Sequence, residues 1–149
     1  MRNGIVSGMH VFTYGTLMFP DVWQSVVGRM FATVEGTAAG FAVFRVRDAV
    51  FPGIVGATDG SVRGVVYLDV DADSIERLDK FEDDFYERRS IWVDCDDGQR
   101  IAADAYVVPQ AGRAVLTDEP WDRDSFVASG GLEHFINRFA GFGRVANGD

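Results

Sequence analysis

Apolar residues follow two spacings along the chain, one typical of strands and one typical of helices. Residues 11–13 are β-branched or aromatic, which favours a buried strand. Residues 20–27 are predicted as a helix, because proline suits the first helical turn and Asp21 complements the positive end of the helix dipole. Gly28 is expected to end this helix.

Two strands are predicted next, over residues 31–34 and 41–46. The segment between them, residues 36–40, begins and ends with glycine and is expected to be flexible. Arg45 and Arg47 alternate with apolar neighbours, as on a strand with one polar face. We interpret them as solvated or ion-paired strand arginines.

The following segment is also predicted to form sheet. Residues 51–56 are expected to be a turn that leads into a short apolar strand, and residues 59–61 a hairpin-like turn. Residues 62–70 carry apolar side chains in both strand phases. A strand that is apolar on both faces is buried on both faces, which favours a closed or helix-covered sheet.

A second helix is predicted over residues 72–81, with Asp71 as its N-cap. Ile75 and Leu78 form its apolar stripe, and Glu82 is the next position along that stripe. The spacing therefore places a carboxylate at the C-terminal end of a buried helix face.

The predicted environment of Glu82 has two alternatives. If the helix carries it inward, desolvation, the negative end of the helix dipole and the neighbouring Asp83 and Asp84 should all raise the pKa of its carboxyl. If the helix ends before Glu82, the residue lies in an acidic surface turn.

Residues 86–95 are predicted as a strand whose apolar positions change phase after Arg88. This change indicates either a bulge near residues 89–90 or two covered faces. Residues 96–98 are predicted as a hairpin turn, and residues 101–108 as the returning strand.

The C-terminal part is predicted as a loop followed by a helix. Residues 109–120 are rich in glycine, proline and small side chains, and a loop of that length could reach over a pocket. Residues 123–139 are predicted as the last helix, broken or bent at Gly130 and Gly131.

Composition and charge narrow the function classes. The chain has 149 residues, 47% of them apolar, which suits one globular domain, expected over residues 9–140 with flexible ends at residues 1–8 and 141–149. Its net charge of −9 argues against a nucleic-acid partner, because phosphate binding requires clustered Lys and Arg. Apolar runs are too short for a membrane span, and the N-terminus does not resemble a secretory signal.

Cysteine and histidine usage argues against disulfides and metal sites. Cys95 is the only cysteine, so no intrachain disulfide can form, and its phase in the strand predicts a small core residue. His10 and His134 each lack a second ligand nearby in the sequence. A reducing, cytoplasmic setting is therefore expected.

Gly15 interrupts the first predicted strand, and a helix start follows it. A strand, a glycine turn and a helix start together can direct backbone N–H groups at a common point, which suits an anion. The alternative is an ordinary connection from strand to helix.

Two motifs carry a family resemblance. The N-terminal loop reads Tyr-Gly-Thr-Leu over residues 14–17, and a later segment reads Leu-Asp-Lys-Phe-Glu over residues 78–82, followed by Tyr86 and Arg88. Both motifs in this order resemble the gamma-glutamylcyclotransferase-like family, including the gamma-glutamylamine cyclotransferases. The likeness extends from residue 9 to about residue 139.

The resemblance implies a mixed α+β fold, in which helices pack on a small, mostly antiparallel, barrel-like β-sheet. It also implies release of 5-oxoproline from a small gamma-glutamyl substrate, whose own α-amine attacks its γ-carbonyl, so that neither cofactor nor metal is needed. Glu82 matches the family's general acid/base. The residues expected to hold or surround the substrate are Tyr14, Gly15, Thr16, Leu17, Tyr86, Arg88 and Tyr106, the last with core packing as its alternative.

One departure from the family pattern concerns the substrate. Many relatives have glycine after the catalytic glutamate, whereas this chain has Asp83 and Asp84. Their charges could raise the pKa of Glu82 or repel a substrate carboxylate. Two other functions stay open: a non-catalytic binding or interaction domain, and a related amide-cleaving biosynthetic enzyme with a larger acceptor. The sequence does not predict an oligomeric state.

Overall fold

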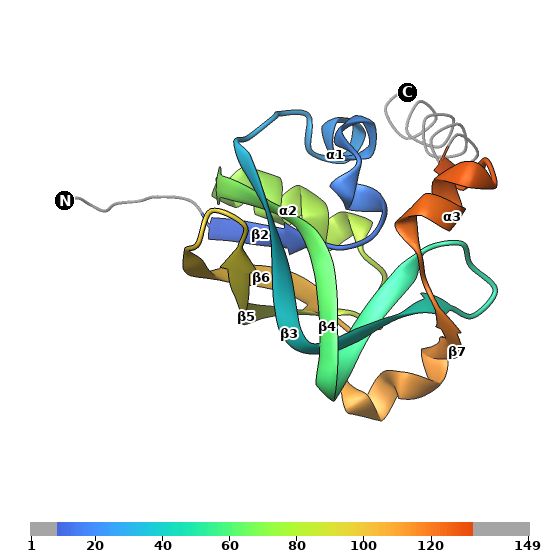
Figure 1. The fold of residues 1–149 in the computed structure, drawn as a ribbon. Coiled ribbons are helices and arrows are strands. Elements are labelled where there is room, and N and C mark those ends of the chain that lie inside the picture. The colour runs from blue at the N-terminus through green and yellow to red at the C-terminus, as the bar shows by residue number, and fades with distance from the viewer. Residues whose placement is uncertain (1–8, 133–149) are drawn as a thin grey trace, which may run out of the picture.

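A computed structural model describes residues 9–132 (Figure 1). In chain order, its elements are β2 (Met9–Thr13), the 3₁₀ helix η1 (Thr16–Met18), α1 (Pro20–Val27), β3 (Thr33–Val46), β4 (Pro52–Val70), α2 (Ala72–Phe81), β5 (Glu87–Cys95), β6 (Arg100–Val107), the 3₁₀ helix η2 (Gln110–Val115), β7 (Leu116–Pro120) and α3 (Arg123–Ala128).

Five of the strands form a closed ring. β2 pairs with β4, β4 with β3, β3 with β5, β5 with β6, and β6 with β2 again, while β7 pairs only with β3. The contact between β2 and β6 is parallel, and the other pairings around the ring are antiparallel. The expected mixed fold with a small, mostly antiparallel, barrel-like sheet is therefore confirmed.

The sheet has an apolar core on each of its faces. The inner core fills the barrel and includes Phe12, Ile54, Val66, Val93 and Cys95. The outer core lies between the sheet and the helices, where Trp23 of α1 stacks on Tyr67 of β4 with ring centroids 3.6 Å apart. Strand β4 contributes to both cores, which confirms that residues 62–70 are buried on both faces.

Both early helices have the predicted bounds. α1 ends at Gly28, whose φ of 84° suits glycine. α2 begins after Asp71, whose Oδ1 accepts a hydrogen bond of 3.3 Å from the Ser74 backbone N–H. The sequence signals for caps were therefore sufficient to set these elements.

The β5–β6 hairpin also follows the prediction at its turn, where Gly98 has a φ of 94°. The bulge considered near residues 89–90 is absent, because the register of β5 on β6 runs without a shift from Glu87 to Asp94. Tyr86 precedes the strand, which accounts for part of the phase change. The other alternative, two covered faces, does not hold either, because residues 87–90 are all exposed and Arg88 reaches Asp79 of α2 from an exposed position.

The predicted break in β3 is wrong, since β3 is one strand through residues 36–40. A Cβ on Gly36 would lie 2.8 Å from Cγ1 of Val93 and 2.9 Å from the carbonyl oxygen of Asp94. This glycine therefore permits a close approach of β5 and does not make the chain flexible. Gly40, with a φ of 90°, lies where the register of β3 on β4 shifts.

The predicted turn at residues 59–61 is also wrong, because β4 continues through it. Residues 57–60 form a bulge opposite Gly40 in the ladder with β3. A Cβ on Gly60 would overlap the carbonyl oxygen of Phe41. Here too glycine allows two backbones to approach, and the bulge bends the long hairpin.

The C-terminal part differs from the prediction as well. Residues 109–120 are not a loop but form η2 and β7, and Leu116 of β7 is buried against Val46 and Val108. α3 ends at Ala128, and the chain breaks at Gly130, with a φ of 81°, as predicted. The rest of the helix predicted to residue 139 lies outside the described residues.

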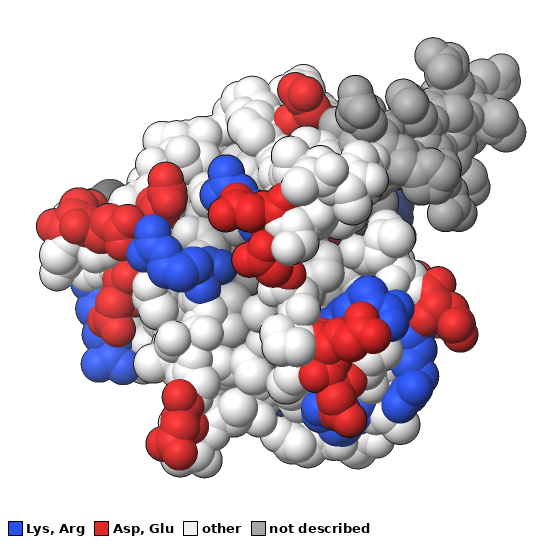
Figure 2. All heavy atoms as spheres, turned by 45° about the vertical axis from the view of Figure 1, so that its right-hand side comes forward, with Lys and Arg blue, Asp and Glu red and all other residues white. Residues whose placement is uncertain are grey.

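Charged side chains are mixed on the visible surface. Figure 2 shows acidic groups in several clusters, most of them beside Lys or Arg, around a largely uncharged centre. Within residues 9–132, no helix is long and apolar enough to cross a membrane, and no group of His, Cys, Asp and Glu is placed to hold a metal ion. His10 accepts a hydrogen bond from the Asp69 backbone, while His134 lies outside the described residues.

Candidate active site

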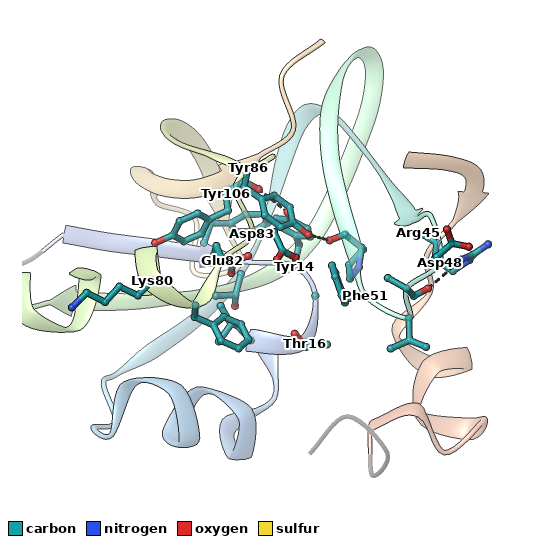
Figure 3. Close-up of a pocket in the computed structure, with 18 residues that line it drawn as sticks. Tyr14, Thr16, Arg45, Asp48, Phe51, Lys80, Glu82, Asp83, Tyr86 and Tyr106 are labelled. Carbon is teal, nitrogen blue, oxygen red and sulfur yellow. Dashed lines mark hydrogen bonds between the residues drawn. The ribbon is translucent and has the colours of Figure 1, made fainter. Parts of the chain in front are cut away.

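A cavity of about 810 Å³ opens where three segments meet: the loop after β2, the C-terminal end of α2 and the connection between β3 and β4 (Figure 3). This volume is in the range typical of small-molecule sites. Its lining consists of residues 12–17, Arg45, residues 48–52, residues 80–83, Tyr86 and Tyr106.

The loop after β2 forms one wall. Gly15 is the N-cap of η1, and a Cβ there would lie 2.8 Å from Cγ and 2.9 Å from Cδ of Pro52. The glycine is therefore required by the protein's own packing. Thr16 and Leu17 follow as buried residues of η1.

The start of η1 leaves backbone donors for a ligand. The first N–H groups of a helix lack carbonyl partners within it. No side chain among the described residues caps η1. Gly15, Thr16 and Leu17 line the cavity, and the use of their N–H groups as ligand donors stays a prediction.

Glu82 stands at the end of α2, as its C-cap. Its backbone N–H donates to the Leu78 carbonyl at 3.0 Å, and its own backbone is extended, so the helix ends before this residue. The half-buried side chain nevertheless lines the cavity. Burial, followed by repulsion from Asp83 and Asp79, raises the pKa of Glu82 to about 8. Asp79, one helical turn earlier, has the effect that the sequence assigned to Asp84.

Three tyrosines line the cavity near Glu82 (Figure 3). The Tyr14 hydroxyl donates to the Tyr106 carbonyl, the Tyr86 hydroxyl to the Pro52 carbonyl and the Tyr106 hydroxyl to Oδ1 of Asp79, each at 2.6 Å. Burial raises the pKa of all three hydroxyls above the ordinary value. They are therefore protonated donors whose protons are already engaged by the protein.

Arg88 does not line the cavity, although the resemblance placed it in the site. Its Nε and Nη2 donate to the two carboxylate oxygens of Asp79 at 2.9 and 3.2 Å, and its Nη1 donates to Asp104 at 2.7 Å. These bonds raise the pKa of the guanidinium. Any effect of Arg88 on a ligand must pass through its carboxylate partners.

The wall opposite Glu82 was missed by the sequence reasoning. It comes from the β3–β4 connection, residues 47–51, and includes Asp48, Val50 and Phe51. Arg45 also lines the cavity while its Nε donates to Glu119 at 2.9 Å, which confirms its interpretation as an ion-paired arginine. No motif marks this connection, and only its position between two strands could have indicated a role.

No residue of the segment 109–120 lines the cavity, so the predicted reach of that segment over a pocket is wrong. η2 and β7 instead support the β3–β4 connection, because the Val115 carbonyl accepts a hydrogen bond of 2.8 Å from the Arg47 backbone. The segment thus contributes to the second wall indirectly.

Comparisons with known proteins identify the family and the fold. The family described as gamma-glutamyl cyclotransferase, AIG2-like, matches residues 11–123. AIG2-like protein D of Arabidopsis thaliana is 35% identical over 91 residues, covering 61% of this chain and 60% of the relative. AIG2-like protein A of the same plant is 33% identical over 99 residues, covering 66% and 60%. The chain thus matches about three fifths of the length of these curated relatives.

Solved structures show the same fold. A solution structure of another Arabidopsis thaliana protein has a TM-score of 0.70 at 26% identity, with 97% of this chain and 96% of that one covered. A structure named gamma-glutamyl cyclotransferase has a TM-score of 0.60 at 14% identity, with 67% and 66% covered. From the family match over most of its length, the chain belongs to the AIG2-like gamma-glutamyl cyclotransferase family.

Proposed function

We propose that the protein is a cofactor-free gamma-glutamyl cyclotransferase, which releases 5-oxoproline from a gamma-glutamyl amine or amino acid. The observation that carries the proposal is the position of Glu82. A carboxyl with a pKa near 8 lines the same cavity as a loop with uncapped backbone donors. Strongly perturbed acids in clefts are frequent at catalytic sites.

The proposed reaction needs no nucleophile from the protein. The substrate's α-amine nitrogen attacks its own γ-carbonyl carbon, a C–N bond closes the five-membered ring, and the original amide C–N bond breaks. Glu82 takes a proton from the attacking nitrogen and returns it to the departing one. A carboxylate that ionises near neutral pH suits both transfers, and such catalysis contributes about 10²–10⁴-fold.

We assign to the loop of residues 14–17 the binding of the substrate's negatively charged group. Its backbone N–H groups suit either the oxyanion that forms on the γ-carbonyl or the substrate's α-carboxylate. Losing one oxyanion donor typically costs about 3 kcal/mol. Tyr14, Tyr86 and Tyr106 donate to protein acceptors, so we assign them to the shape of the cavity and not to proton transfer.

The charges around the cavity indicate which kind of leaving group the site accepts. Asp83 adds a negative charge beside Glu82, while the cationic side chains of Lys80 and Arg45 are paired with Glu76 and Glu119. This balance disfavours a second substrate carboxylate near the scissile amide. An acceptor amine without an adjacent carboxylate fits the site best. The proposal includes a cytoplasmic location, where the thiol of Cys95 stays reduced.

Product detection tests the proposal. The full chain is incubated with a panel of gamma-glutamyl amines, gamma-glutamyl amino acids and glutathione, and 5-oxoproline is measured by mass spectrometry. Glu82→Gln should abolish product while leaving the fold intact. Glu76→Gln, which removes an exposed carboxylate of the same helix, is the matched control and should keep activity.

A different result would favour the second candidate, a non-catalytic binding domain of the same fold. The large cavity supports ligand binding by itself. Thermal stabilisation by panel compounds without any 5-oxoproline would overturn the enzymatic proposal. Equal product from native protein and Glu82→Gln would overturn the role of Glu82.

A further inference from the structure

Asp79 joins three parts of the fold outside the cavity. It lies on α2, one turn before Glu82, and receives two hydrogen bonds from Arg88 on β5 and one from the Tyr106 hydroxyl on β6. Asp104, whose side chain is only 15% exposed, holds the other side of the guanidinium. Arg88 and Tyr106 face each other in the register of the two strands.

These contacts continue into the cavity through Tyr106. Its ring lines the cavity, its hydroxyl is held by Asp79, and its carbonyl accepts the hydroxyl of Tyr14. Tyr14 is the first residue of the loop of residues 14–17, in which η1 begins without a side-chain cap. One chain of hydrogen bonds therefore connects the end of α2, which carries Glu82, to the loop after β2, which forms another wall of the cavity.

We propose that Asp79 and Arg88 act together as positioning residues for Glu82. Their ion pair holds Tyr106 against the end of α2, and Arg88 balances the charge that Asp79 places beside Glu82. The catalytic meaning of this inference depends on the proposed function, but the charge balance is a property of the free protein.

Removing either partner breaks the same ion pair but changes the charge near Glu82 in opposite senses. Asp79→Asn deletes a negative neighbour, so the pKa of Glu82 should fall. Arg88→Gln leaves Asp79 uncompensated, so the pKa should rise. The charged or titratable groups that face Glu82 from its own segment and from the elements packed on it are Asp79, Lys80, Asp83, Tyr14, Tyr86 and Tyr106.

The test is a titration of the Glu82 side-chain carboxyl by ¹³C NMR in the full chain. We expect its midpoint to move down in Asp79→Asn, to move up in Arg88→Gln and to return close to the native value in Arg88→Lys, which keeps the charge. A salt bridge whose charges do not reach Glu82 predicts no shift in either variant. Shifts of the same sign in the first two variants, or none, would overturn the inference.

Matched controls come from an ion pair elsewhere on the surface. Arg63 and Asp96 lie 2.7 Å apart on the surface, and neither lines the cavity. Arg63→Gln and Asp96→Asn should leave the Glu82 midpoint unchanged. If they moved it as far as the Asp79 and Arg88 variants do, the effect would reflect net charge alone and the inference would fail.

Activity measurements separate this inference from the proposed function. If the protein releases 5-oxoproline, the acidic limb of its kcat profile should follow the NMR midpoint in each variant. Opposite midpoint shifts in a protein that yields no product would support the positioning of Glu82 and contradict the proposed function. Product formation with unmoved midpoints would support the proposed function and contradict the positioning of Glu82.

Discussion

Replacing Glu82 with glutamine should make the protein more stable, although it should remove the proposed activity. Folding raises the pKa of this carboxyl from an ordinary 4.5 to about 8. A carboxyl with a raised folded-state pKa supports folding fully below the unfolded value, and this support is lost as the pH rises through the folded value. Ionised Glu82 therefore destabilises the folded state at neutral and alkaline pH.

The size of this destabilisation follows from the pKa shift of Glu82. At about 1.4 kcal/mol per pKa unit, the full difference is about 5 kcal/mol above pH 8 and about 3 kcal/mol at pH 7. Because the side chain is only half-buried and lines an open cavity, solvent screening makes these figures upper limits. Glutamine has a similar shape and does not ionise, so Glu82→Gln should recover part of this free energy.

Urea unfolding at pH 5, 7 and 9 measures the effect. The gain in the free energy of unfolding for Glu82→Gln should be small at pH 5 and should grow towards pH 9. Glu76→Gln, an exposed change on the same helix, should alter stability by about 0.5 kcal/mol or less at every pH. A gain independent of pH, or a loss at pH 9, would refute the buried-carboxyl reasoning.

Three further substitutions test contacts that hold the elements around the site in place. Gly15→Ala should cost about 1–3 kcal/mol in urea unfolding, because its Cβ would lie 2.8 Å from Pro52; an unchanged midpoint would contradict this packing. Asp71→Ala should cost about 1 kcal/mol by removing the cap bonded to Ser74, and Asp71→Asn should recover most of it. Tyr86→Phe should cost about 1–3 kcal/mol by leaving a carbonyl without its donor, and native stability in calorimetry would show that water replaces the hydroxyl.

Local sequence signals predicted the ends of the helices well, but they gave the wrong role to the glycines inside the strands. The cap at Asp71 and the stop at Gly28 depend on nearest neighbours, so the sequence was sufficient for both. Gly36 and Gly60 have no local role as turn residues. They allow strands distant in sequence to approach, and that requirement becomes visible only after the barrel closes. β7 was missed because its pairing with β3 is equally non-local.

The distinction between local signals and non-local contacts also explains which residues of the candidate site were predicted. Motif residues brought Glu82 and the loop of residues 14–17 to attention, and the structure places both on one cavity. Arg88 belongs to the motif too, yet it faces Asp79 outside the cavity, because its strand phase points it towards α2. The wall formed by residues 48–52 lies far from both motifs in the sequence, so its position depends on how the long β3–β4 hairpin bends.

The β3–β4 hairpin forms one wall of the cavity, whereas Glu82 stands on a different wall, at the end of α2. Residues 47–51 connect β3 to β4 at the tip and are held from outside by η2 and by Trp121, whose indole donates to the Val50 carbonyl at 2.8 Å. No pairing of the closed ring uses residues 47–51, so this connection can vary in sequence without breaking the ring. If the proposed function holds, the tip is the part of the cavity where substrate selectivity can change in evolution while the wall that carries Glu82 stays constant.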